Sequence, residues 1–254
     1  PIEGRTTGEL DIHDICGRAG APPLFDATRF NCLATLDERH SYQPVWMPPF
    51  VDRHVAEDRC HLNGLACEGD RPAYVTAVAQ TNAPGAWREH RQKGGVVLDV
   101  ATGEPVATGL SMPHSPRLHR GALYCLQSGT GEVGTVDGNT GRFRALCDLP
   151  GFPRGLDFLG GHAIVGVSGP RRGQAFEGLP LTDRMASRGL APRCMIAVVD
   201  LETGAVAHTL DLHGVVSELY DVAVLEGFRR PKLLGFRTPE VRFQVRPAPF
   251  GRAF

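Results

Sequence analysis

The sequence lacks any apolar run that approaches the roughly 18 residues of a membrane-spanning helix, and it shows no signal-peptide pattern. It also lacks an excess of one charge, because 27 Lys and Arg residues stand against 28 Asp and Glu residues. No segment carries the basic face that nucleic-acid-binding proteins use. Neither a membrane nor a nucleic acid is therefore expected as a partner.

The seven cysteines include no Cys-x-x-Cys pair, which removes the usual sequence sign of a zinc or dithiol site. Their number is odd, and most lie in apolar runs where a free thiol behaves as a small hydrophobe. We expect reduced, structural cysteines and a cytoplasmic protein. The Gly-x-Ser-x-Gly and His-Glu-x-x-His patterns are absent as well, so neither of those hydrolase classes has support.

What the sequence does contain is a repeated turn. An Asp is followed three and four residues later by Thr-Gly in "LDVATGE" (98–104), "VDGNTGR" (136–142) and "VVDLETGA" (198–205), and "TLDERHS" (35–41) is a diverged copy. The Gly can adopt the positive φ of a tight turn, and the Asp can accept hydrogen bonds from the turn backbone. A period near 40 residues with four short strands in each repeat is typical of propeller blades.

Short runs rich in alternating or β-branched apolar residues predict strands between the turns. The expected strands are 72–80, 94–100, 105–111, 122–128, 162–168, 195–201 and 206–212. The segments 9–16, 60–67, 112–119, 152–159 and 217–224 are expected to be the innermost strands of five blades. The sequence thus predicts one all-β domain over 1–254, a β-propeller, with a loop insertion at about 169–193 and a short helix near 181–190.

Four segments resemble the signature of an uncharacterised bacterial family of conserved hypothetical proteins. They are "DRCHLNGLA" (58–66), "GLSMPHSPR" (109–117), "LPGFPRGLDF" (149–158) and "ELYDV" (218–222). The resemblance implies six blades, of which this chain supplies five, with further residues before its N-terminus and an incomplete final blade. The chain departs from the family pattern at Asp26 or Ala27, where Asn is common. The resemblance implies no reaction.

Polar residues mark the beginnings of the expected inner strands, and these beginnings should meet around one axis. Alignment of the strands by their apolar pattern puts Asp11, His61, His114, Arg154 and Glu218 at similar heights, with His13, Asn63, Asp157 and Asp221 nearby. We expect His61, His114, Glu218 and Arg154 to be catalytic and the others to contact substrate. Asp157 and Asp221 could instead connect neighbouring blades through backbone amides.

Two kinds of chemistry fit this residue set. His61, His114 and Glu218 could bind a divalent metal, with water completing its coordination shell. The same residues could form a metal-free acid–base pair, with Arg154 holding a substrate carboxylate. In either case the hypothesis is a lyase or hydrolase that acts on a small polar or carboxylate-bearing molecule in the central pocket.

The alternative is a non-catalytic propeller that binds a peptide or protein partner on its top face. The insertion at about 169–193 carries Phe176, Leu179, Leu181 and Met185 among polar residues. These side chains could contact a partner or form a lid over the pocket. A deep polar pocket would favour the enzyme, and an apolar top surface would favour the binding protein.

Overall fold

The computed structural model describes residues 6–169, 177–232, 235 and 239–240. The chain divides into two compact units, of which one is Thr7–Val224 and the other combines Pro1–Thr6 with Leu225–Phe254. All sixteen strands of the described residues lie in the first unit. In the second unit, the described residues hold no strand, and the amide of Phe228 donates to the carbonyl of Leu225 at 3.2 Å.

Within Thr7–Val224, the strands form four antiparallel sheets of four strands each. The first sheet contains β1 (Ile15–Arg18), β2 (Ala21–Ala27), β3 (Cys32–Thr35) and β4 (Gln43–Trp46). The second contains β5 (Leu62–Glu68), β6 (Arg71–Ala77), β7 (Gly95–Asp99) and β8 (Pro105–Leu110). The third contains β9 (Pro113–His119), β10 (Ala122–Gln127), β11 (Glu132–Val136) and β12 (Phe143–Asp148). The fourth contains β13 (Phe152–Leu159), β14 (His162–Ser168), β15 (Met195–Asp200) and β16 (Val206–Asp211).

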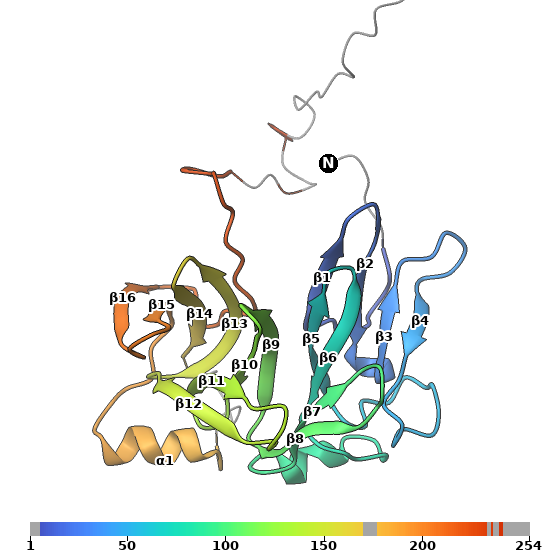
Figure 1. Cartoon of the computed structure of the whole chain (residues 1–254), viewed down its shortest axis with the longest axis horizontal. Coiled ribbons are helices and arrows are strands. Elements are labelled where there is room, and N and C mark those ends of the chain that lie inside the picture. The colour runs from blue at the N-terminus through green and yellow to red at the C-terminus, as the bar shows by residue number, and fades with distance from the viewer. Residues whose placement is uncertain (1–5, 170–176, 233–234, 236–238, 241–254) are drawn as a thin grey trace, which may run out of the picture. The chain divides into compact units, whose positions relative to one another are not determined.

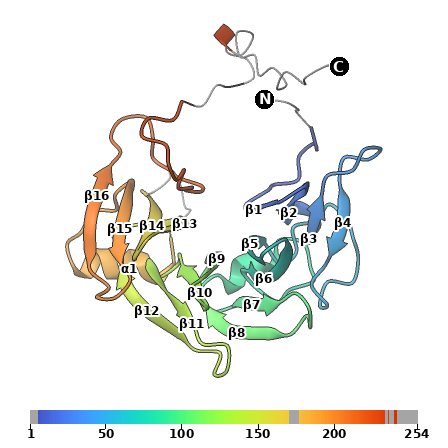
Figure 2. The same cartoon turned by 45° about the horizontal axis from the view of Figure 1, so that its top comes forward.

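Each sheet is a meander, because its strands pair in chain order (Figure 1). The four sheets follow one another along the chain, with β5, β9 and β13 innermost and β4, β8, β12 and β16 outermost (Figure 2). The first strands of successive sheets contact each other: β1 contacts β5, β5 contacts β9, and β9 contacts β13. The all-β prediction is therefore confirmed, and the beginnings of the first strands converge.

The repeated Asp turns join the third and fourth strands of their sheets. Asp99 Oδ1 accepts the amide and the hydroxyl of Thr102 at 2.8 and 3.0 Å. Asp200 Oδ1 accepts the same two groups of Thr203, both at 2.8 Å. The following Gly103 and Gly204 have φ of 76° and 74°, which a side chain would disfavour. These residues are structural.

Alternation of apolar residues explains how the sheets pack. In β15, Met195, Ala197 and Val199 are buried while the residues between them are partly exposed. They form one core cluster with side chains of the third and fourth sheets, among them Leu126 and Val165. The core thus lies between the faces of neighbouring sheets, where each fully buried aliphatic side chain contributes roughly 1.5–3 kcal/mol.

Two of the five expected inner strands differ from the prediction. In 9–16 the strand begins only at Ile15, and residues 9–14 lead into it without sheet pairing. Residues 217–224 have no strand assignment. In the described part of the chain no strand follows them, so 217–224 has no hydrogen-bonded neighbour of its own sheet. Two later apolar segments, 231–236 and 241–245, could have completed this blade, but the described residues of the first form no strand and the second lies outside the described residues.

The insertion contains the expected helix, α1 (Pro180–Ser187), which lies beside β12 (Figure 1). Arg184 of α1 donates to the carbonyl of Leu149 at 2.7 Å. Leu179, Leu181 and Met185 are buried, so they cannot be the exposed contact surface considered above. Phe176 lies outside the described residues.

In the part of the chain that the structure describes, no helix has the length and apolar character to cross a membrane.

Candidate functional site

A cavity of about 410 Å³ opens where the first strands of the sheets begin. Six of the nine residues that the sequence singles out line it: Asp11, His13, His61, His114, Arg154 and Glu218. They lie in the first strands of the sheets, just before those strands, or in the segment 217–224, so residues that are more than 200 positions apart in the chain meet in one place. The cavity has both cationic and anionic side chains in its wall.

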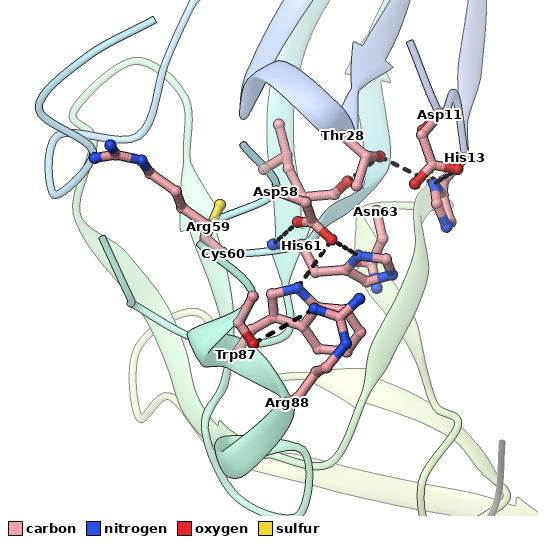
Figure 3. A network of polar contacts seen from close by, with 12 residues as sticks. Asp11, His13, Thr28, Asp58, Arg59, Cys60, His61, Asn63, Trp87 and Arg88 are labelled. Carbon is pink, nitrogen blue, oxygen red and sulfur yellow. Dashed lines mark hydrogen bonds and ion pairs between the residues drawn. The ribbon is translucent and has the colours of Figure 1, made fainter. Parts of the chain in front are cut away.

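The best-organised feature of the cavity is the pair His61 and Asp58 (Figure 3). Asp58 Oδ2 lies 2.8 Å from His61 Nδ1 and accepts the indole N–H of Trp87 at 2.9 Å, while Oδ1 accepts the backbone amide of His61 at 2.9 Å. A carboxylate that only accepts hydrogen bonds requires the imidazole proton on Nδ1. His61 Nε2 therefore carries a lone pair, and no described residue hydrogen-bonds to it.

Aromatic packing fixes the orientation of the His61 ring. The ring stacks on Trp87 with centroids 4.1 Å apart, and the edge of His13 meets it at 4.8 Å. The His61 backbone is left-handed, with φ of 54°. Asp11 and Met112, which also line the cavity, share this conformation at φ of 56° and 47°. Non-glycine residues in this region are strained, and such strain concentrates at functional sites.

One hydroxyl contact recurs between neighbouring sheets and defines which residues are equivalent. In each case a Ser or Thr stands at the end of the second strand of a sheet or just after it. Its hydroxyl donates to a backbone carbonyl at the beginning of the next sheet's first strand, or of the segment 217–224. The pairs are Thr28 with Leu62 at 2.6 Å, Ser128 with Pro153 at 2.6 Å and Ser168 with Leu219 at 3.1 Å. The segment 217–224 therefore docks like the beginning of a fifth inner strand, even though it has no strand assignment.

These contacts correct the alignment expected from the sequence. The residues just before the contacted carbonyls form one set of equivalent positions, and the residues just after them form a second set. By the hydroxyl contacts and the shared left-handed backbone, the first set is Asp11, His61, Met112, Phe152 and Glu218. The second set is His13, Asn63, His114, Arg154 and Tyr220. His114 and Arg154 thus lie two positions further into their strands than the position equivalent to His61. The alignment by sequence missed this shift, because the pattern of apolar residues does not reveal where the backbone is left-handed.

His13 is held as a neutral imidazole. Its Nδ1 lies 2.9 Å from the Asp11 carbonyl and 2.9 Å from Thr28 Oγ1. Thr28 uses its own hydrogen on Leu62, so both neighbours of Nδ1 are acceptors and Nδ1 carries the proton. Burial, with the nearby His61 adding to it, lowers the pKa of His13 to about 4.

His114 repeats this arrangement two sheets away. Its Nδ1 lies 2.9 Å from the Met112 carbonyl and 3.1 Å from Ser128 Oγ, whose hydrogen goes to Pro153. Its Nε2 lies 3.2 Å from Asn63 Nδ2, which donates to it. Burial, followed by the charge of Arg154, lowers the pKa of His114 well below its usual value. Both ring nitrogens are thus occupied, and the side chain is neutral.

Arg154 is the cation at the deeper position of the fourth sheet. Its guanidinium carbon lies 4.8 Å from the centroid of the Tyr220 ring and 6.0 Å from that of Phe152. A guanidinium that packs on aromatic rings keeps its positive charge, and its shape matches the two oxygens of a carboxylate. Arg154 therefore contributes a cation to the cavity wall.

Three of the residues singled out from the sequence do not line the cavity. Asn63 is buried behind it and accepts the hydroxyl of Thr76 at 2.9 Å as well as donating to His114. Asp157 accepts the amide of Val224 at 2.6 Å. Asp221 caps the amide of Val222 at 2.9 Å. Asp157 thus connects its sheet to the fifth inner segment, which is the structural role considered above.

The side chains offer no ready-made metal centre. In the described residues, no three His, Cys, Asp or Glu side chains are grouped so that they could hold a metal ion. His61 has its Nδ1 on Asp58, and both nitrogens of His114 are hydrogen-bonded. The expected set of His61, His114 and Glu218 therefore does not fit a metal ion as arranged here.

Several cavity residues were missed by the sequence analysis. They are Asp58, Trp87, Arg88, Arg91, Met112, Phe152, Ser168 and Tyr220. Asp58 could have been found, because it precedes His61 by three residues, a spacing that lets one carboxylate contact both the amide and the ring. Trp87 belongs to the 3₁₀ helix η2 (Ala86–His90) between β6 and β7, and no local pattern links that loop to the pocket.

The buried neutral His13 predicts a loss of stability in acid. Its pKa is about 4 in the folded chain and about 6.5 when unfolded, so the unfolded state binds more protons between these values. The stabilisation is complete above about pH 7 and falls as the pH drops toward 4, by on the order of 1–3 kcal/mol. Urea unfolding from pH 7.5 to 4.5 measures it. The free energy of unfolding of His13→Gln should fall less over this pH range than that of wild type. An equal fall would contradict the assignment of His13 as a buried neutral imidazole.

The buried carboxyl group of Asp26 is expected to change stability with pH in the opposite direction, so that stability falls as the pH rises. Its side chain is fully buried, Oδ1 accepts the amides of His13 and Asp14 at 2.7 and 3.0 Å, and Oδ2 has no described partner. Burial, with Asp14 adding to it, raises the pKa of Asp26 well above its usual value, so ionisation costs stability as the pH rises. Asp26→Asn should raise the melting temperature at pH 8 and leave it nearly unchanged at pH 4. Equal gains at both values would contradict this.

The family described as "Domain of unknown function (DUF4915)" matches residues 1–234. No curated protein matches the chain.

Among solved structures, the chain is similar to the computationally designed Ika8 protein, at 13% identity and a TM-score of 0.46, covering 85% of this chain and 53% of that one. A protein of unknown function from Bacteroides caccae has 13% identity and a TM-score of 0.46, covering 79% and 60%. Hydrazine synthase of Kuenenia stuttgartiensis has 13% identity and a TM-score of 0.47, covering 84% and 52%. The chain thus spans about half the length of the designed protein.

Proposed function

The chain belongs to the DUF4915 family, and on that premise we propose that it is a β-propeller enzyme that moves a proton on a small carboxylate-bearing molecule. The four meander sheets in chain order support the propeller, as does the docking of Leu219 like Leu62 and Pro153. The polar cavity at the beginnings of the inner strands supports the enzyme over a peptide-binding module.

The observation that carries the proposal is the Asp58–His61 pair. Asp58 keeps the imidazole proton on Nδ1, so Nε2 can accept a proton from a bound molecule and later return it. Trp87 holds both partners, by its stacked ring and its indole N–H. General acid–base catalysis of this kind typically contributes about 10²–10⁴-fold to a rate.

Arg154 supplies the binding half of the proposed site. A carboxylate on Arg154 would place the neighbouring carbon within the same cavity as His61. Proton removal next to a carboxylate or carbonyl is the first step of many lyase reactions, and the same imidazole could activate water in a hydrolase. We favour this metal-independent chemistry because the nitrogens of His114 are already hydrogen-bonded.

The binding step has a direct test. Arg154→Gln should weaken butyrate or pyruvate binding by about tenfold or more, because a charge-assisted pair is worth roughly 1.5–3 kcal/mol. Isothermal titration calorimetry measures the affinity, and Arg142→Gln, an exposed residue outside the cavity, is the control. Equal affinity in wild type and Arg154→Gln would remove the proposed carboxylate site.

The metal-dependent version is tested separately. Elemental analysis of protein purified without a His-tag should find no near-stoichiometric metal. A stoichiometric divalent ion that disappears in His61→Asn would replace the metal-independent mechanism by a metal-dependent one.

A further inference from the structure

The loop that carries Trp87 has a net positive charge. Over residues 86–94 it holds Arg88, His90, Arg91 and Lys93 against a single acidic residue, Glu89. The loop is anchored by its side chains, because Arg91 Nη2 donates to the carbonyl of Glu177 at 3.4 Å and Nε donates to the carbonyl of Arg88 at 3.1 Å. The Arg91 guanidinium is therefore held in place beside the cavity.

Arg88 and Arg91 belong to two cavities at once. They line the central cavity with His61, and they also line a neighbouring cavity of about 420 Å³ whose wall is made by residues of the same loop and Gly178. Both cavities are thus lined by Arg88 and Arg91. A ligand in the central cavity can thus extend toward the basic loop.

Among the residues that the structure describes, Arg88 and Arg91 form no ion pair with a carboxylate. Arg88 instead lies over the Trp87 ring, with its guanidinium carbon 4.3 Å from the centroid, and donates only weakly to the Gly85 carbonyl at 3.5 Å. Two arginines without an acidic partner among the described residues, in a concave wall, suit a carboxylate or phosphate group.

Arg88 and Arg91 come from a different part of the fold than Arg154, the proposed carboxylate-binding residue. Arg154 comes from β13 of the fourth sheet, whereas Arg88 and Arg91 come from the loop between β6 and β7 of the second sheet. His61 directly precedes β5 of the second sheet and stacks on Trp87, the neighbour of Arg88. The reactive imidazole therefore lies in a cavity with cationic groups from two sides.

From this arrangement we propose that the ligand carries two anionic groups, one bound by Arg154 and the other, a carboxylate or a phosphate, bound by Arg88 and Arg91. The inference rests on the proposed function for the role of Arg154. It narrows the substrate class from small carboxylates to short dianions, such as dicarboxylates or phosphorylated carboxylic acids. The atoms between the two anionic groups would then lie beside His61.

Three probes of similar length test the proposal by calorimetry in 150 mM NaCl: butyrate with one anionic group, succinate with two carboxylates, and 3-phosphonopropionate with a carboxylate and a phosphonate. We expect succinate or 3-phosphonopropionate to bind at least tenfold more tightly than butyrate. The tighter of the two identifies the second group. If neither dianion exceeds butyrate, the proposal is overturned.

Variants separate this inference from the proposed function. Arg88→Gln/Arg91→Gln should reduce dianion affinity to that of butyrate and leave butyrate binding unchanged, whereas Arg154→Gln should weaken all three probes. Arg142→Gln/Arg144→Gln removes two exposed charges outside both cavities and should change nothing. Equal losses for butyrate and dianions in the Arg88/Arg91 variant would overturn the second site while leaving the first intact. Arg88→Gln alone carries the test if the double variant unfolds.

Discussion

Replacement of Arg117 by alanine is expected to lower the free energy of unfolding by about 3–5 kcal/mol. Arg117, on β9, forms a bidentate pair with Asp14 at 2.7 and 3.0 Å. It also donates to the carbonyl of Leu65 at 3.1 Å and to that of Leu156 at 3.0 Å. One side chain thus connects three sheets with the segment that leads into the first, and its loss leaves Asp14, only 4% exposed, as a buried carboxylate without its cation.

Arg193 provides the matched control. Its guanidinium also forms a two-point pair, with Asp211, but this pair is partly exposed to solvent. Arg193→Ala should cost only about 0.2–1 kcal/mol. Urea unfolding of both variants measures the difference, and Arg117→Ala/Asp14→Ala should be less destabilised than the sum of the single variants. Similar small losses at Arg117 and Arg193 would show that the inner strands do not depend on this contact.

Replacement of His61 by asparagine is expected to reduce proton transfer in the cavity by about 10²–10⁴-fold while the fold persists. Asparagine tolerates the left-handed backbone at φ of 54° better than most residues, so the substitution removes the imidazole without adding strain. The measurement is deuterium incorporation at C3 of pyruvate, the carbon next to its ketone, followed by NMR in D₂O. Anion affinity should change by less than about threefold, since Arg154 is intact.

Asp58→Asn is the companion variant. The amide keeps the shape of Asp58 but no longer fixes the proton on His61 Nδ1, so exchange should slow while the anion still binds. His40→Asn is the control, because His40 also pairs with an aspartate three residues away, Asp37, at 2.7 Å but lies on the surface. Exchange that persists at the wild-type rate in His61→Asn would mean that another group is the base.

The sheet pattern could be predicted from the sequence because it depends on local signals. The Asp-Thr-Gly turn fixes its own geometry, as at Asp99 and Thr102, and alternation in β15 marks the buried face directly. The absence of strand pairing at residues 217–224 has no such local signal, and only the family resemblance implied it, as an incomplete final blade. The residues of this segment contact Ser168, yet a β-strand forms only where a neighbouring strand supplies backbone hydrogen bonds. Such a neighbour would have to come from residues that follow.

The candidate site could be predicted only in part. The polar beginnings of the inner strands identified His61 and Arg154, but their relative depth depends on left-handed residues such as Met112, which apolar periodicity does not reveal. Trp87 and Arg88 come from a loop that reaches the cavity only through tertiary packing, which no local sequence pattern shows. Asp58 alone had a local signal, the three-residue spacing to His61.

The proton position on His61 is the most direct test of the proposed chemistry. NMR of protein labelled with ¹⁵N-histidine at pH 8 distinguishes the two imidazole tautomers. We predict a protonated Nδ1 and an unprotonated Nε2 for His61, with the Nε2 signal shifting when succinate is added to wild type and remaining unchanged in Arg154→Gln. A proton on Nε2, or an Nε2 signal that succinate does not move in wild type, would contradict the assignment of His61 as the base of an anion-binding site.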